Sequence, residues 1–340
     1  MKKSTKLCLI TATVLILVGL ALGITVISIY DWDFDKLSTV EYVTNIYEVH
    51  GTFHDISIDI DHADILFSPS SDGVCKVECY DSQKASYTAT TLGDALVIKS
   101  NYHFDFPESL NIVTESPKVT VYLPENAYGD LNIVGNTGDV EIPKRFTFST
   151  MDICLSTGDV VCYASGFTSQ NIRTSTGDIE LYNVQTNSMG LSVTTGQIKL
   201  TDVSCHGKLS LNVSTGRSTL HNVRCIDFHS EGSTGPLAAE ELQVTDTLNL
   251  TRSTGKVSLK NSLAEKLSIT TETGDVTLDA FTAQAVNIQT DTGDVIANFT
   301  APMSFHTKTD TGKVSAPDTI GYPCYVKTDT GDISLSVPEG

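Results

Sequence analysis

The chain has 340 residues, of which 41 are acidic and 22 are basic, and its formal net charge is −19. Hydrophobic residues make up 40% of it, enough to bury a core, which excludes a disordered polyelectrolyte. The acidic balance argues against a nucleic-acid-binding protein, because phosphates require a basic face. Lys2, Lys3 and Lys6 are the only charged residues among the first 30, so an acidic body follows a short basic head.

The N-terminal segment over residues 7–30 has no charged residue and is dominated by Leu, Ile, Val and Ala. About 20 apolar residues span a bilayer as a helix, so we expect a transmembrane anchor over 7–30 after a cytoplasmic tail of residues 1–6. The lysines of the tail predict a cytoplasmic N-terminus and an extracellular C-terminal body. Tyr30 and Trp32 would lie at the outer interface, where aromatic rings are favoured.

A cleaved signal peptide is the alternative for this segment, since Ala21-Leu22-Gly23 offers a small-residue cleavage site. The apolar run continues seven residues beyond Gly23, however, which is longer than a typical signal-peptide core. Cys8 lies before most of the run and does not resemble a lipoprotein acylation site. The pattern therefore favours an uncleaved single-pass anchor in the cell membrane.

The segment after the anchor is irregular. Residues 31–40 are typical of a short acidic linker, and residues 41–130 are predicted to form degenerate rungs that cap a repeat. In that part Ile56, Ile58 and Ile60 alternate with polar residues, and strands are also expected over 95–98 and 119–123. Terminal repeats of solenoids are often atypical because they cover the end of the core.

Residues 131–340 contain a repeat marked by eleven Thr-Gly pairs, spaced 19 or 20 residues apart. The threonines of these pairs are Thr137, Thr157, Thr176, Thr195, Thr215, Thr234, Thr254, Thr273, Thr292, Thr311 and Thr330. The consensus is Leu-x-Ile-x-Thr-x-Thr-Gly-Asp-Val-x-Leu, which residues 267–278 match throughout. With Thr as position zero, apolar residues occupy −6, −4, +3 and +5, which is the two-residue period of a strand. A further apolar position follows at +8 or +9, as at Val184, Leu263 and Ile320.

A rung of this length with two or three short strands predicts an all-β fold, a single-stranded parallel β-helix or β-solenoid. Each strand would pair with its counterpart in the next rung at about 4.8 Å, and the Gly would permit the bend between strands. Single rungs cannot bury their apolar residues, whereas stacked rungs share a continuous core. The handedness of parallel crossovers favours a right-handed coil. The motifs of hexapeptide helices and of calcium-binding rolls are not matched.

These features resemble the bacterial "putative adhesin" family, a domain of unknown function that includes the LiaG-like envelope proteins of Gram-positive bacteria. The resemblance rests on the basic head, the apolar helix, the segment Lys118-Val119-Thr120-Val121-Tyr122-Leu123-Pro124 and the serial Thr-Gly-Asp-Val motifs. It covers roughly residues 50–340. It implies a cell-surface β-solenoid with an adhesive or envelope-stress role, and it brings no catalytic residues.

Acidic residues precede the Thr of the last four repeats, at Glu272, Asp291, Asp310 and Asp329. Like charges in register repel one another, and Ca²⁺ with oxygen ligands would relieve that repulsion, so a calcium ladder is one hypothesis. Plain solvation is the other and is favoured, because Lys308 and Lys327 lie two residues from Asp310 and Asp329. In addition, no compact Ca²⁺ loop motif is present, and no other cofactor is expected.

The last repeat is predicted to leave an unpaired strand edge at the C-terminal end. Such edges invite pairing with another molecule, and charges on the edge protect against it. Asp329, Asp332 and Glu339 would supply these charges. Either the charges suffice, or another chain covers that end.

The eight cysteines and eight histidines show no zinc-ligand or catalytic spacing. Cys205 and Cys225 both lie at position +10 of their repeats, so we expect them on adjacent rungs, close enough for a disulfide. An extracellular body permits this oxidation. Buried free thiols are the alternative.

The favoured interpretation is a non-catalytic, membrane-anchored surface protein whose solenoid binds an envelope polymer, a host surface or another membrane protein. The alternative is an accessory or regulatory component of a cell-envelope stress-response system. A polysaccharide-acting enzyme is a lesser alternative, because parallel β-helices can be lyases or hydrolases. Such an enzyme needs paired carboxylates or a base in a cleft of long loops, yet the rungs barely vary in length. Its one candidate region is the mixed-charge set of Arg217, Arg252, Lys256 and Asp275.

Overall fold

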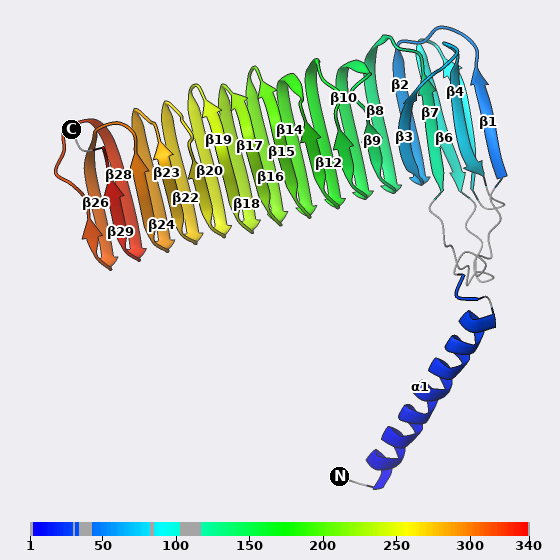
Figure 1. The fold of residues 1–340 in the computed structure, drawn as a ribbon, viewed down its shortest axis with the longest axis horizontal. Helices are drawn as coiled ribbons and strands as arrows, with labels where there is room; N and C mark the ends of the chain where they lie inside the picture. The colour runs from blue at the N-terminus through cyan, green and yellow to red at the C-terminus, as the bar shows by residue number, and fades with distance from the viewer. Residues whose placement is uncertain (1–2, 30, 34–42, 82–84, 103–116, 339–340) are drawn as a thin grey trace.

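The computed structural model describes residues 3–29, 31–33, 43–81, 85–102 and 117–338. The helix α1 (Lys3–Ile29) contains a 22-residue apolar span, Cys8–Ile29, with a mean hydropathy of 2.6. By length and composition this span can cross a membrane, and none of it is buried against the rest of the chain. The helix lies apart from a long β structure that contains all the strands (Figure 1).

That β structure is the β-solenoid that the repeat predicts (Figure 1). In each of its eleven regular rungs, one strand ends at the Thr of a Thr-Gly pair and a shorter or equal strand begins three residues later. The rungs are β8 (Ala127–Thr137) and β9 (Val140–Ile142), β10 (Thr147–Thr157) and β11 (Val160–Cys162), β12 (Phe167–Thr176) and β13 (Ile179–Tyr182), β14 (Gln185–Thr195) and β15 (Ile198–Cys205), β16 (Lys208–Thr215) and β17 (Ser218–Cys225), β18 (Asp227–Thr234) and β19 (Leu237–Val244), β20 (Thr247–Thr254) and β21 (Val257–Lys260), β22 (Lys266–Thr273) and β23 (Val276–Phe281), β24 (Ala285–Thr292) and β25 (Val295–Phe299), β26 (Met303–Thr311) and β27 (Val314–Ser315), and β28 (Tyr322–Thr330) and β29 (Ile333–Ser336).

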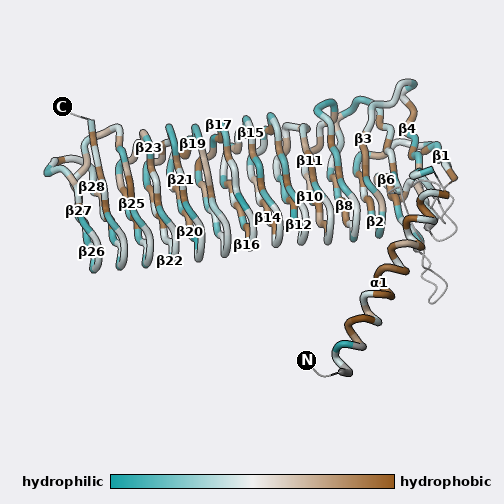
Figure 2. Tube along the Cα trace, turned by 60° about the horizontal axis from the view of Figure 1, so that its bottom comes forward, coloured by the Kyte–Doolittle hydropathy of each residue, from teal (hydrophilic) through white to brown (hydrophobic). Residues whose placement is uncertain are grey.

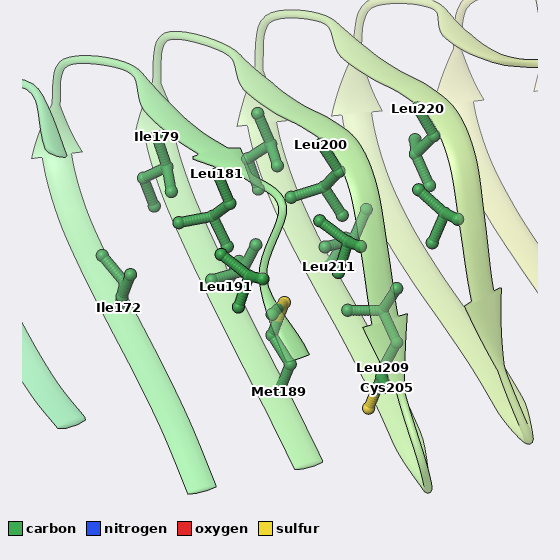
Figure 3. Close-up of a cluster of buried hydrophobic side chains, with 14 of the residues drawn as sticks. Ile172, Ile179, Leu181, Met189, Leu191, Leu200, Cys205, Leu209, Leu211 and Leu220 are labelled. Atoms are coloured by element: carbon green, nitrogen blue, oxygen red, sulfur yellow. The ribbon is translucent and has the colours of Figure 1, made fainter. Parts of the chain in front are cut away.

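The strands stack in parallel and in register, so equivalent repeat positions lie against each other. Ile153, for example, pairs with Ile133 on one side and with Ile172 on the other. Apolar and polar residues alternate along each rung (Figure 2), and the apolar ones fill the interior. In Figure 3, Leu181 and Leu191 point into this interior from adjoining rungs, and each is at most 2% exposed. The period-two pattern therefore builds one continuous core, as predicted.

The structure adds an inward column at position +10 that the apolar pattern alone does not predict. Its buried members are Phe167, Thr186, Cys205, Cys225, Val244, Ala264 and Ala283. It also shows that not every apolar residue at position +8 or +9 is buried. Leu263 is 39% exposed while the preceding Ser262 is buried, and Ile320 is 95% exposed. These two members of the apolar +8 or +9 position therefore lie outside the core.

Two corners shape each rung. At the first, the Gly of every Thr-Gly pair has φ between 130° and 156°, and a Cβ on Gly158 would lie 2.0 Å from the carbonyl oxygen of Gly138. At the second, six successive rungs hold a non-glycine residue with φ between 48° and 59°. These residues are Asn183, Asp202, Asn222, Glu241, Asn261 and Ala280. Strict alternation along the strand would point the next residue outward. The left-handed conformation shifts the alternation by one residue, so the next residue points inward.

The N-terminal end of the rod is only partly built from rungs. Its strands are β1 (Val43–Val49), β2 (Asp55–His62), β3 (Asp64–Pro69), β4 (Cys75–Asp81), β5 (Ala85–Leu92), β6 (Ala95–Tyr102) and β7 (Lys118–Leu123). Strands β2 and β3 stack in parallel on β8 and β9, and β6 and β7 stack on them in turn. The other three strands pair antiparallel: β4 pairs with β7, β1 pairs with β4, and β5 pairs with β6. The prediction of degenerate rungs over 41–130 thus misses these antiparallel strands, which cover the end of the stack.

At the C-terminal end, the last two rungs are exchanged relative to chain order. Strand β28 pairs with β24 on one side and with β26 on the other, and β29 likewise lies between β25 and β27. The terminal rung is therefore β26–β27, and the predicted edge at Asp329 and Asp332 is wrong, because both residues belong to an inner rung. Glu339, the third predicted edge charge, lies outside the described residues.

The composition of the two rungs explains the exchange. The inward positions of β28–β29 hold Cys324, Val326, Ile333 and Leu335, which are all buried. The same positions of β26–β27 hold Phe305, Thr307, Val314 and Ala316, none of which is fully buried. Placing the more apolar rung inside removes more apolar surface from water, which is the favourable arrangement.

Candidate functional sites on the solenoid

The four acids predicted as a calcium ladder lie on one outer line, in the spatial order Glu272, Asp291, Asp329 and Asp310. The exchange of rungs brings Asp329 next to Asp291. Lys327 Nζ lies 2.9 Å from a carboxylate oxygen of Asp329, and Lys308 Nζ lies 3.3 Å from one of Asp310. Among the described residues, no group of three or more His, Cys, Asp or Glu side chains could hold a metal ion. The two lysines thus offset part of the repulsion among these acids. Calcium binding by them stays a hypothesis.

A second set of acidic residues, two positions after the Thr in six of the eleven rungs, forms hydrogen bonds with the backbone. The Asp159 carboxylate accepts the N–H of Asp178 over 2.7 Å, and the Asp139 carboxylate accepts that of Asp159 over 2.8 Å. The same contact joins Asp275 to Asp294, at 3.1 Å. These carboxylates satisfy amide groups at the glycine corner, where the backbone makes fewer ladder bonds. The Thr-Gly-Asp motif is therefore explained by structure before any ligand is considered.

Other surface charges pair from rung to rung at the spacing of the repeat. Lys260 Nζ lies 2.9 Å from Glu240, and Lys266 Nζ lies 3.2 Å from Asp246. The hydrogen bond to Glu240 raises the pKa of Lys260, and the one to Asp246 raises the pKa of Lys266. All four side chains are well exposed, so each pair adds little to stability.

The mixed-charge region considered for an enzyme does not form one surface. Arg252 is 3% exposed, and its guanidinium occupies space left by the missing side chain of Gly232. It donates to Ser230 Oγ over 2.8 Å and to the Thr251 carbonyl over 2.9 Å. Burial lowers the pKa of Arg252 to about 10. Two small residues of one rung, Ser230 and Gly232, thus leave the space that the large side chain of Arg252 fills in the adjacent rung.

Cys205 and Cys225 are both buried and belong to the ends of the paired strands β15 and β17. They are thiols in this structure, and Cys205 Sγ lies 3.3 Å from the carbonyl oxygen of Lys208. Burial raises the pKa of both, and the neighbouring Cys205 contributes to the shift at Cys225. The disulfide between them stays a prediction.

A hollow lies at the N-terminal cap, which sequence reasoning did not single out. It has a volume of about 560 Å³ and is formed by the loops that follow β1, β3 and β7. Phe53 and Tyr128 stack in its wall with ring centroids 6.0 Å apart, and His50 and His54 also line it. No repeat motif marks these loops, so the pattern of the sequence could not have pointed to them.

An aromatic pair lies on the outer surface of the regular rungs. Tyr163 and Tyr182 stack with ring centroids 5.3 Å apart, and Lys199 Nζ lies 5.1 Å from the centre of the Tyr182 ring. Lys199 also donates to the Tyr182 hydroxyl over 2.8 Å, and that hydroxyl donates to Glu180. The pair is small and its polar groups are already engaged with each other.

Comparison with known proteins decides the family. A profile of the Toastrack DUF4097 family matches residues 53–217 and 207–340. The chain belongs to this family. The resemblance drawn from the Thr-Gly-Asp-Val motifs is thereby confirmed, whereas comparison with curated proteins gives no match.

Solved structures similar to this Toastrack chain include three of low identity. A "putative adhesin" from Parabacteroides distasonis is 11% identical, with 76% of this chain and 98% of that one covered and a TM-score of 0.37. A "putative lipid binding protein" from the same species is 15% identical, with 89% and 98% covered and a TM-score of 0.32. A "putative cell adhesion protein" from Clostridium sporogenes is 8% identical, with 88% and 100% covered and a TM-score of 0.25.

Proposed function

We propose that this Toastrack protein is a non-catalytic, membrane-anchored surface solenoid that binds an envelope polymer, a host surface or a partner protein through its regular outer faces. The constancy of the rungs carries the proposal. From β12 to β23 each rung repeats the same two corners with no inserted loop, so the surface is a periodic array of polar side chains. Such an array suits a repetitive partner, because each rung offers the same contacts again.

The anchor is the second part of the proposal. The apolar span Cys8–Ile29 is long enough for a bilayer, and the hydroxyls of Thr13 and Thr25 have partners within the helix. Thr13 donates to the Leu9 carbonyl over 2.9 Å, and Thr25 donates to that of Ala21 over 2.7 Å. These bonds suit a hydrocarbon environment, where an unpaired hydroxyl is unfavourable. The three lysines before the span favour a cytoplasmic N-terminus, which would leave the solenoid outside.

The native cysteines allow this topology to be tested without introducing new cysteines. Cys154 is exposed on the solenoid, whereas Cys75, Cys162, Cys225 and Cys324 are buried. We expect a membrane-impermeant maleimide to label intact cells that carry the full chain, and Cys154→Ser to abolish most of the labelling. Labelling that appears only after the cells are lysed would overturn the extracellular placement.

Binding is tested with the full chain in lipid nanodiscs. We expect it to sediment with isolated cell walls or to bind host cells, and empty nanodiscs to do neither. Crosslinking in living cells separates this from the regulatory alternative, which requires a membrane protein as the main crosslinked partner. Release of new reducing ends from acidic or neutral glycans would instead favour an enzyme and overturn the non-catalytic proposal.

A further inference from the structure

The terminal rung leaves a strand edge open at the end of the rod farthest along the stack from β1 (Figure 1). Within the described part of the chain, β26 pairs with β28 on one side and β27 pairs with β29, and no strand pairs with either on the other side. Strand β26 has nine residues and contains no proline. A long edge strand of this kind is a template for pairing with another chain. We call this surface, residues 303–322, the tip.

Apolar side chains are exposed at the tip, and Val314 lacks the cover that its equivalents have in inner rungs. Val314 is 46% exposed, whereas Val295 and Ile333 at the same repeat position are at most 1% exposed. Ile320 is 95% exposed and Tyr322 is 46% exposed. An open edge and open apolar groups at one place indicate an interaction surface.

The charges on β26 indicate what covers it. Lys308, Thr309 and Asp310 repeat the order of Lys327, Thr328 and Asp329, and parallel stacking lines up like charges between these two rungs. In an antiparallel pair with Thr309 opposite Thr309 of a second copy, Lys308 of each copy faces Asp310 of the other. Unlike charges directly opposite each other stabilise a strand pair, and a two-fold interface repeats each contact.

The other end of the rod does not offer an equivalent edge. There β4 and β5 pair antiparallel on β7 and β6, and β1 extends the sheet beyond β4. A parallel, head-to-tail stack of rods would require the terminal rung to meet such antiparallel strands. The two-fold arrangement, by contrast, joins two identical open edges and closes both of them.

We propose that two copies of the chain associate tip to tip, through antiparallel pairing of β26 centred on Thr309. The contact rests on the fold and the charge pattern of the tip. If the chain is also anchored at the surface, as proposed above, the pairing joins rods that stand on two facing membranes.

Charge reversal tests the pairing in the full chain, with one chain in each nanodisc so that helices cannot associate. Light scattering is expected to detect pairs of discs, and electron microscopy is expected to find each pair joined at the tips of the rods. Lys308→Asp and Asp310→Lys should each weaken the pairing about tenfold or more, because two favourable contacts become repulsive. A mixture of the two variants should restore it, because every contact is then again between unlike charges.

The neighbouring rung supplies the matched control. Lys327→Asp and Asp329→Lys change the same ion pair one rung inward and should leave the association intact. All four side chains are substantially exposed, so the variants should fold like the original chain, as circular dichroism can check. The proposal is overturned if single discs prevail at all concentrations, or if mixing the two β26 variants restores nothing. Neither result affects the labelling of Cys154 or the binding of cell walls, so the proposed function is tested separately.

Discussion

Asp332 donates its backbone N–H to the carboxylate of Asp294 over 2.8 Å, although the two residues are 38 positions apart in the chain. A complete rung, β26–β27, lies between them in the sequence but outside them in space. The N-terminal end shows a related departure from chain order, since β2–β3 lies between β6–β7 and β8–β9. At both ends, the rung nearest the chain terminus is placed one layer inward and another segment covers it.

The exchange at the C-terminal end predicts unequal effects of substitutions at the same repeat position of the last two rungs. Leu335 is 5% exposed, and Leu335→Ala should lower the stability of the last rungs by about 2–5 kcal/mol. Ala316 occupies the same repeat position in the terminal rung and is exposed, so Ala316→Leu should change stability by less than about 0.5 kcal/mol. Amide hydrogen exchange of residues 322–336 in the full chain measures both effects. If the rungs followed chain order, Leu335→Ala would be nearly neutral.

The repeat was enough to predict the fold, because Thr-Gly spacing fixes the rung length and a two-residue period fixes which side chains are inside. It could not predict the order of the last rungs, since Lys308-Thr309-Asp310 and Lys327-Thr328-Asp329 are equivalent in pattern. That order depends on which rung buries more apolar surface. The inward positions of the terminal rung include Thr307 and Ala316, whereas those of the inner rung include Val326 and Leu335. The burial of Arg252 was missed for a similar reason, because it depends on Gly232 in the preceding rung rather than on a local pattern.

The close approach of rungs at the glycine corner predicts a severe effect of an added methyl group. Gly216 has φ of 145°, and a Cβ there would lie 1.6 Å from the Gly196 carbonyl oxygen, so Gly216→Ala must separate the two rungs. Gly73 has φ of 75° but no atom within 4 Å of the added Cβ. Gly73→Ala should therefore lose only the strain of the left-handed conformation, about 1–2 kcal/mol, and Gly216→Ala clearly more. Urea unfolding compares them, and equal losses would show that the close approach is unimportant.

The carboxylate column at the same corner predicts a difference between two replacements of one residue. Asp294 accepts the N–H of Asp332, so Asp294→Ala should lower the free energy of unfolding by about 1–2 kcal/mol. Asp294→Asn keeps an acceptor oxygen and removes one charge from a line that contains Asp275 and Asp332. It should lose less than the alanine variant, and the gap should be the same at low and high salt, because both replacements remove the charge and only the asparagine keeps the acceptor. Equal losses for both variants at every salt concentration would argue against the hydrogen bond.

The buried thiol of Cys162 predicts a dependence of stability on pH. Cys162 pairs with Ile142 and Leu181, and burial raises its pKa from 9.0 to about 12. Between pH 9 and 12 the unfolded chain loses this proton while the folded chain keeps it, so stability falls as pH rises. At pH 10.5 the loss from this thiol is about 2 kcal/mol, and Cys162→Val should remove it.

Chemical unfolding at pH 8 and pH 10.5 gives the difference in stability between the Cys162→Val variant and the original chain. Leu181→Val in the next rung is the control, because its effect should be the same at both pH values. A constant difference for Cys162→Val would mean that the thiol ionises equally well in the folded chain.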